Sequence, residues 1–161
     1  MIYAFVESIK YVGHMIPVAL LRIFLGYFYF NEALSTYHRG FLQHAYIAED
    51  IRNYLPLSTA PDWYKNALET VLIPNWQVFA TVYLAIQFLI GISYIAGYMV
   101  RPVSLIAILY CGFISFSLGS QLYLVQISFL VILHLMIGWI GAGRCLGFDY
   151  FFYKRRRGIW W

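Results

Sequence analysis

The sequence predicts an all-α integral membrane protein, a four-transmembrane-helix bundle with an N-terminal interfacial helix and an extracytoplasmic lid between spans one and two. Of its 161 residues, 62% are hydrophobic and only 11% are charged, against about 25% charged residues in soluble domains. The run from His134 to Asp149 ends in glycines, Arg144 and Asp149. A chain leaves a bilayer in this way, because charge is tolerated where side chains reach headgroups or water. The length suits one membrane domain, residues 1–161, without a soluble catalytic module.

The chain begins with a predicted amphipathic helix. Ile2, Phe5, Val6 and Ile9 recur at helical spacing beside polar residues, so we expect this helix to lie in the membrane interface. The first fifteen residues lack a basic start followed by an apolar core and show no small-residue cleavage site, so we expect no removable signal peptide.

Four apolar runs are predicted to cross the bilayer. In order they are residues 17–34, 78–100, 103–118 and 122–142. Pro17 suits a helix start, and Arg101-Pro102 is expected to stop span two. A tight turn near residues 117–121 joins the last two spans into a hairpin. Small residues where helices can approach closely are Gly91, Gly97, Gly138, Gly141 and the S-x-x-x-G pattern that begins at Ser115.

The lid is predicted over residues 35–75, which are more polar and contain three prolines. Two candidate helices lie near residues 41–54 and 62–73. Because a connection this long is uncommon unless it has a structure and a function, we expect it to cover one end of the bundle.

Charge predicts the orientation of the spans. Eight basic and two acidic side chains fall on the side that holds Arg22, and three basic and five acidic side chains fall on the other. Short cytoplasmic segments are enriched in Lys and Arg, so we expect both termini on the cytoplasmic side of a prokaryotic inner membrane. The basic tail, residues 150–161, either only marks this topology or also holds anionic lipid headgroups.

Three stretches carry a likeness to a known family. They read L-L-R-I-F-L-G-Y-F-Y-F-N-E-A at residues 20–33, F-L-I-G-I-S-Y-I-A-G-Y-M-V-R-P at residues 88–102 and G-A-G-R-C-L-G-F-D at residues 141–149. In this order they resemble the DoxX family of small four-span membrane proteins, which includes the DoxD subunit of thiosulfate:quinone oxidoreductase. The resemblance implies association with redox enzymes and, for the thiosulfate-oxidising members of the family, a membrane subunit that works with quinone. It supports the fold more than the reaction.

Arg22, Arg101 and Arg144 are expected to meet at the cytoplasmic end, near Asp149. Guanidinium groups there can bind an anionic headgroup or neutralise charge that develops on a quinone. Alternatively they snorkel toward the headgroups, and an Arg–Asp149 pair locks the helix ends.

Three polar residues at other depths are further quinone- or lipid-binding candidates. Glu32 either accepts a quinol proton at the outer face or bonds to loop amides or Arg39. His134 and Gln87 lie well inside spans, and His134 is expected to bond to Gln87, a serine, a tyrosine or a quinone carbonyl. No cluster has the ligand set of a metal site, and we expect neither haem nor a disulfide.

Our leading hypothesis is an integral membrane subunit of a larger quinone-linked redox complex that provides a quinone or lipid pocket and anchors a catalytic partner. The alternative is a non-catalytic accessory subunit that stabilises a respiratory, photosynthetic or transport complex. A small-solute transporter is a third hypothesis. It is disfavoured because no span is broken at mid-membrane by paired Gly or Pro. Membrane lipids and other protein subunits are the expected partners, and nucleic acid is not.

Overall fold

The computed structural model describes residues 13–118 and 121–155, and within these ranges the protein is all-helical, with no strand. The predicted fold class is confirmed to that extent. Three helical stretches are long and apolar enough to cross a membrane, namely Gly13–His38, Trp76–Ala96 and Val100–Ser117. The predicted interfacial helix, the centre of the predicted turn at residues 117–121 and the end of the basic tail lie outside the described residues.

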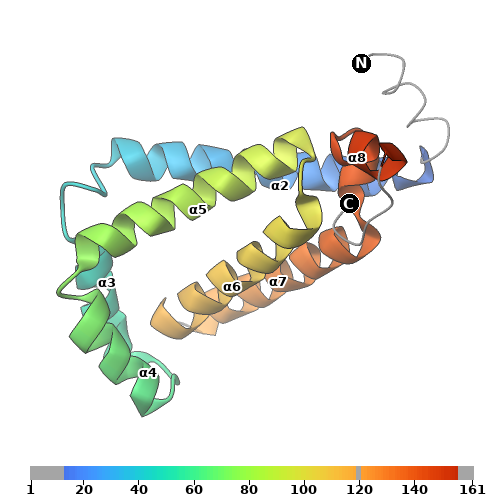
Figure 1. Cartoon of the computed structure of the whole chain (residues 1–161). Helices are drawn as coiled ribbons and strands as arrows, with labels where there is room; N and C mark the ends of the chain where they lie inside the picture. Colours follow the sequence, from blue (N-terminus) through green and yellow to red (C-terminus); the bar gives the residue numbers. More distant parts are fainter. Residues whose placement is uncertain (1–12, 119–120, 156–161) are drawn as a thin grey trace.

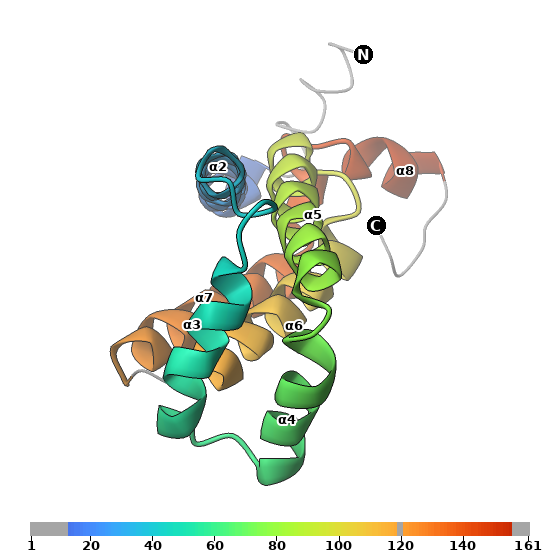
Figure 2. The ribbon, with the colours of Figure 1, turned by 90° about the vertical axis from the view of Figure 1, so that its left-hand side faces the viewer.

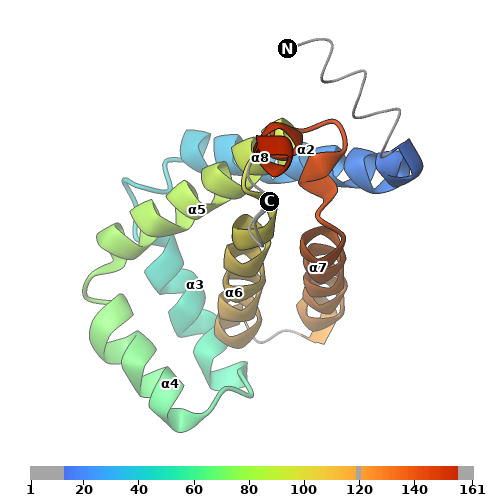
Figure 3. The same cartoon turned by 45° about the vertical axis from the view of Figure 1, so that its right-hand side comes forward.

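The four long helices form two antiparallel pairs. They are α2 (Ile16–His38) with α5 (Trp76–Ala96), and α6 (Val100–Leu118) with α7 (Gln121–Ile140). The shorter α-helices among the described residues are α3 (Tyr46–Tyr54), α4 (Asp62–Ala67) and α8 (Asp149–Arg155). The two pairs come together beside α8 and diverge toward α3 and α4 (Figures 1 and 3). We call these ends the arginine end, after Arg22, Arg101 and Arg144, and the α3–α4 end.

Glycines allow close approach within each pair. A Cβ atom at Gly26 of α2 would lie 2.8 Å from the Ile95 nitrogen, and one at Gly91 of α5 would lie 2.8 Å from the Phe30 nitrogen. In the other pair, a Cβ at Gly138 would lie 2.9 Å from the Cβ of Ser104. Larger residues at these positions would push the backbones apart.

The end of α5 differs from the prediction. We expected span two to reach residue 100 and Arg101-Pro102 to stop it, and this was wrong. The helix ends at Ala96, because Gly97 adopts a left-handed conformation with φ of 66° and its N–H bonds to the Ser93 carbonyl at 2.8 Å. Arg101 and Pro102 instead belong to the first turn of α6, where a proline is tolerated because the first N–H groups have no partner within the helix.

The segment between α2 and α5 folds against the far end of the bundle. Besides α3 and α4 it contains a 3₁₀ turn, Leu55–Leu57, and a π-helical turn, Leu68–Leu72. The Ser58 hydroxyl donates to the Phe116 carbonyl at 2.5 Å, and the Tyr64 and Ser117 hydroxyls lie 3.2 Å apart. Figure 2, which looks onto this end, shows α3 and α4 beside the ends of the long helices. The apolar cluster beneath them comprises Ile47, Ile51, Leu55, Leu68, Leu72 and Ala80.

Candidate functional site

Arg22 lies inside the bundle at the arginine end. Its position on α2 sends the side chain toward the segment that follows α7, and none of the residue is exposed. Nη1 donates to the carbonyls of Ala142 and Cys145 at 3.0 and 3.4 Å, and Nη2 donates to that of Leu146 at 2.9 Å. These oxygens compensate the charge of a guanidinium removed from water. Arg22 therefore fastens α2 to the segment after α7.

The carbonyls reach Arg22 because the chain after α7 turns through two left-handed residues. Gly141 has φ of 69° and Leu146 has φ of 52°, on either side of a 3₁₀ turn, Ala142–Arg144. Glycine is also needed for space, since a Cβ at Gly97 would lie 2.3 Å from Nη1 of Arg22 and one at Gly147 would lie 2.7 Å from it. The glycine-rich stretches of the sequence thus surround one guanidinium.

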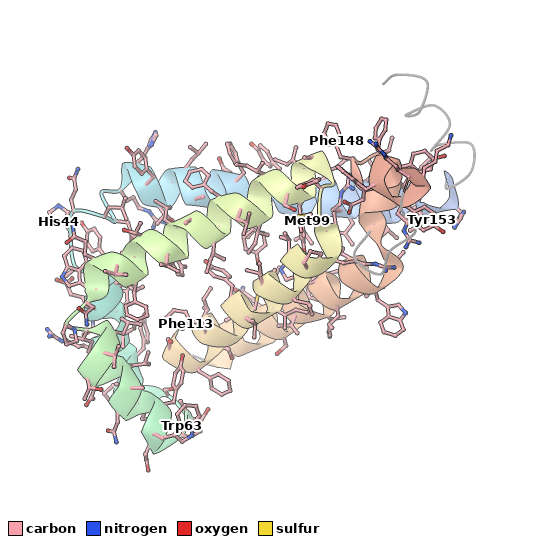
Figure 4. The ribbon with its side chains drawn as sticks, viewed as in Figure 1. His44, Trp63, Met99, Phe113, Phe148 and Tyr153 are labelled. Atoms are coloured by element: carbon pink, nitrogen blue, oxygen red, sulfur yellow. The ribbon has the colours of Figure 1, made fainter. Side chains whose placement is uncertain are left out.

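Asp149 joins the same end to the start of α6. Its carboxylate accepts from the backbone N–H of Met99 at 2.7 Å and of Val100 at 3.1 Å, as an N-terminal cap does. The Asp149 N–H in turn donates to the Gly97 carbonyl at 2.9 Å. Burial raises the pKa of the Asp149 carboxyl, while the two N–H groups and the charges of Arg22 and Arg144 act in the opposite direction. Met99 and Phe148 mark this junction in Figure 4.

The three predicted arginines share one end but have different surroundings. The Arg101 guanidinium lies over Gly141, with Nε and Nη2 each 3.2 Å from where a Cβ of that glycine would be. Arg144 stacks on Tyr153, with Cζ 4.1 Å from the ring centroid. Arg22 is enclosed by carbonyls, so an anion in contact with all three would have to displace part of this structure.

His134 is the centre of a buried polar chain. Its Nε2 lies 2.9 Å from the Tyr29 hydroxyl and its Nδ1 lies 2.8 Å from the Tyr94 hydroxyl, so the expected bond to a tyrosine is present. Tyr94 donates to Ser104 at 3.2 Å, and Ser104 donates to the Val100 carbonyl at 2.7 Å. At the other end, Tyr29 lies 3.6 Å from Sγ of Cys111. The four long helices all contribute to this chain.

Sequence reasoning missed most of these partners. Tyr29, Tyr94, Ser104 and Cys111 look like ordinary span residues in the sequence. The available signal was His134 itself, because a polar group at this depth requires partners on neighbouring helices.

Gln87 and Glu32 lie apart from His134. Nε2 of Gln87 donates to the Tyr110 hydroxyl at 2.8 Å, while its Oε1 is buried without a hydrogen-bond partner. Glu32 forms the foreseen ion pair with Arg39, 3.1 Å from Nη2 to Oε1.

Glu32 also borders a pocket of about 500 Å³ at the α3–α4 end. Asp50 lies in its wall, and partial burial, followed by the charge of Glu49, raises the pKa of the Asp50 carboxyl. The residues that line this pocket are Glu32, Thr36, Arg39, Phe41, Tyr46, Asp50 and Tyr83.

A groove of about 420 Å³ between α6 and α7 brings two predicted residues together. Arg101 of α6 and His134 of α7 line it together with Ser104 of α6. Its remaining walls are Leu105, Ile108, Leu135, Gly138 and Trp139. A groove with a few polar groups and otherwise apolar walls suits an amphiphile with a polar head and an apolar tail.

Within residues 13–118 and 121–155, no three or more His, Cys, Asp or Glu side chains are grouped so as to hold a metal ion. Comparison of the chain with protein-family models, with curated proteins and with solved structures found no match.

Proposed function

We propose that the chain crosses a prokaryotic cytoplasmic membrane four times, with both termini inside and α7 as the fourth span. Support comes from the length of α7, 20 residues, and from its exposed apolar side chains. The latter are Phe129, Ile132, Leu135, Met136 and Trp139. The arginines at one end agree with the enrichment of basic residues on the cytoplasmic side. In this orientation the α3–α4 segment is an extracytoplasmic lid.

Within that membrane, we propose that the protein is a subunit of a quinone-linked redox complex and that the α6–α7 groove binds the quinone. The observation that carries this proposal is that Arg101, Ser104 and His134 all line one otherwise apolar groove. The guanidinium of Arg101 can donate to a quinone carbonyl and stabilise the negative charge that forms on reduction. The aliphatic walls suit the ring and the isoprenoid tail.

The partner subunit would supply the electrons and dock on the lid. The lid presents two large exposed apolar side chains, Leu57 and Trp63. Trp63 lies at the α3–α4 end, far from Tyr153 of α8 (Figure 4). Exposed apolar residues outside the lipid are typical of protein contacts.

Photolabelling tests the quinone site. The protein in lipid nanodiscs is labelled with an azido-ubiquinone, and labelled peptides are mapped with and without excess decylubiquinone. We expect competed labelling on α6 and α7 around the groove. Leu135→Trp, which fills the groove, should abolish it, whereas Ile132→Trp should not. Leu135 and Ile132 are matched, since they are 53% and 54% exposed on the same helix. Labelling spread evenly over the lipid-facing surface would contradict the site.

The accessory subunit is the second candidate, and the outer face of α2 favours it. Leu20, Phe24, Tyr27 and Phe28 form a large exposed stripe that another membrane subunit can cover. For an accessory role, deletion of the protein should reduce the amount of assembled complex and leave the turnover of each remaining complex unchanged. A lower turnover in fully assembled complexes would favour the quinone role instead.

A further inference from the structure

The row of hydrogen bonds through His134 has a definite direction of donation. Ser104 donates its one hydrogen to the Val100 carbonyl, which can only accept, so Ser104 accepts from Tyr94. The Tyr94 hydroxyl therefore has no second hydrogen to donate to His134. In the bond between these two residues, Nδ1–H of His134 must be the donor and the Tyr94 oxygen the acceptor. In a neutral imidazole the other nitrogen is an acceptor, so Tyr29 donates to Nε2. Every donor from Tyr29 onward points toward Ser104.

The row of hydrogen bonds ends at the α6–α7 groove. Ser104 and His134 both line the α6–α7 groove, so a molecule or a water held there is in reach of the last hydroxyl. The Ser104 hydroxyl can rotate from the Val100 carbonyl, within its own helix, to an oxygen in the groove.

Buried polar rings continue from the other end of the chain. The Tyr110 ring lies 6.1 Å from that of Tyr29, and the Tyr83 ring lies 5.1 Å from that of Tyr110, measured between centroids. Gln87 bonds to Tyr110, and its unpartnered Oε1 is a further acceptor at this step. Buried polar atoms normally have a hydrogen-bond partner, and where the protein supplies none the partner is an ordered water.

Tyr83 brings the row to the α3–α4 end. It lines a cavity of about 270 Å³ between α5 and α6, and it also lines the pocket that holds Glu32 and Asp50. Carboxylates at this mouth can collect protons from the water outside.

We propose that the row Tyr83–Tyr110–Tyr29–His134–Tyr94–Ser104 conducts protons from the pocket beside Glu32 and Asp50 to the α6–α7 groove. From Tyr29 to Ser104 each group gives its proton to the next along the hydrogen bonds and receives one from the group before it. Water carries the proton from Tyr110 to Tyr29, whose rings are neighbours. His134 gives up the proton on Nδ1 and takes one on Nε2, so it changes tautomer without changing charge. One proton leaves the pocket and one arrives in the groove, and rotation of the groups restores the first arrangement. This activity needs no quinone, although a quinone reduced in the groove would consume the protons.

Proton flux into liposomes tests the path. The purified full chain is reconstituted with pyranine inside, and a potassium gradient with valinomycin drives proton entry. We expect faster acidification than in protein-free liposomes. Tyr29→Phe, which removes one hydroxyl from the row, should bring the rate back to the protein-free level. The matched control is Tyr27→Phe on the same helix, because Tyr27 is 62% exposed and lies outside the row. It should conduct as the wild type does.

Two flux results would overturn the proposal. They are a wild-type rate equal to that of empty liposomes, and a Tyr29→Phe rate equal to that of the wild type. The absence of quinone labelling in the groove would count against the proposed function alone, since the flux is measured without quinone.

A measurement on the unmodified protein does not depend on whether variants fold. Nitrogen-15 NMR of the His134 imidazole should find the proton on Nδ1 and none on Nε2. A His134 protonated on Nε2 alone would reverse the deduced direction and overturn the proposal.

Discussion

The two ends of the bundle place charge in opposite ways. At the arginine end, Arg22 is sealed among backbone carbonyls, and Asp149 caps α6 from the segment after α7. At the α3–α4 end, Glu32 and Arg39 pair where water reaches both side chains, beside an open pocket. Charge at the first end holds the helices together, whereas charge at the second end is available to water and to ligands.

This difference follows from backbone geometry more than from residue type. Arginine occurs at both ends of α2, yet only Arg22 meets carbonyls that left-handed residues have turned toward it. A buried charge is expensive to leave uncompensated, while a surface ion pair contributes little. The comparison therefore makes ranked predictions for stability.

The largest effect is expected from Arg22→Leu. The substitution removes three charge-assisted hydrogen bonds and leaves the carbonyls of Ala142, Cys145 and Leu146 without this donor. We expect the free energy of unfolding to fall by about 3–5 kcal/mol. Chemical unfolding in detergent micelles measures it. A loss below about 1 kcal/mol, the value typical of surface pairs, would break the contrast between the two ends.

Gly97→Ala should have the next largest effect. The new Cβ would occupy a left-handed position with φ of 66°, 2.3 Å from Nη1 of Arg22. We expect a loss of about 2–3 kcal/mol from backbone strain and crowding. Gly112→Ala is the matched control, because a Cβ there has nothing within 4 Å. It should stabilise α6 by about 0.5–1 kcal/mol. Equal effects in the same unfolding assay would show that space around Arg22 is not limiting.

The arginine end also shows how much of the structure can be predicted from the sequence. Hydropathy predicts the apolar helices because each bilayer crossing requires a long apolar run. Gly97 was a usable stop signal for α5, although we assigned that role to Arg101-Pro102, because glycine after the last helical residue favours a left-handed cap. The bonds from Arg22 to Ala142 and Leu146 were not predictable from the sequence. They join positions more than a hundred residues apart, and the path of the turn that supplies the carbonyls depends on packing. The tyrosine partners of His134 were unpredictable for the same reason, since helix rotation decides which hydroxyls face it.

Asp149→Asn is expected to change the pH dependence of stability by a smaller amount. Because burial raises the pKa of this carboxyl, the folded protein holds the proton at higher pH than the unfolded chain. The wild type should therefore lose stability as pH rises from the usual aspartate value of about 3.9 through the raised folded value, and then level off. The asparagine variant lacks this titration. As pH rises across that range, the thermal unfolding midpoint of the wild type should fall relative to that of the variant. Parallel pH curves for the two proteins would contradict the raised pKa of Asp149.

The smallest effect is expected from Arg39→Ala. Its ion pair with Glu32 has good geometry at 3.1 Å, but the side chains are 64% and 45% exposed, so water and salt weaken the attraction. We expect a loss of about 0.2–1 kcal/mol at low salt and less at high salt, measured by the same chemical unfolding. Arg39 and Arg22 are the same residue type at the two ends of α2, so the two substitutions compare an exposed arginine with a buried one. If Arg39→Ala cost as much as Arg22→Leu, enclosure by carbonyls would not explain what holds the arginine end together.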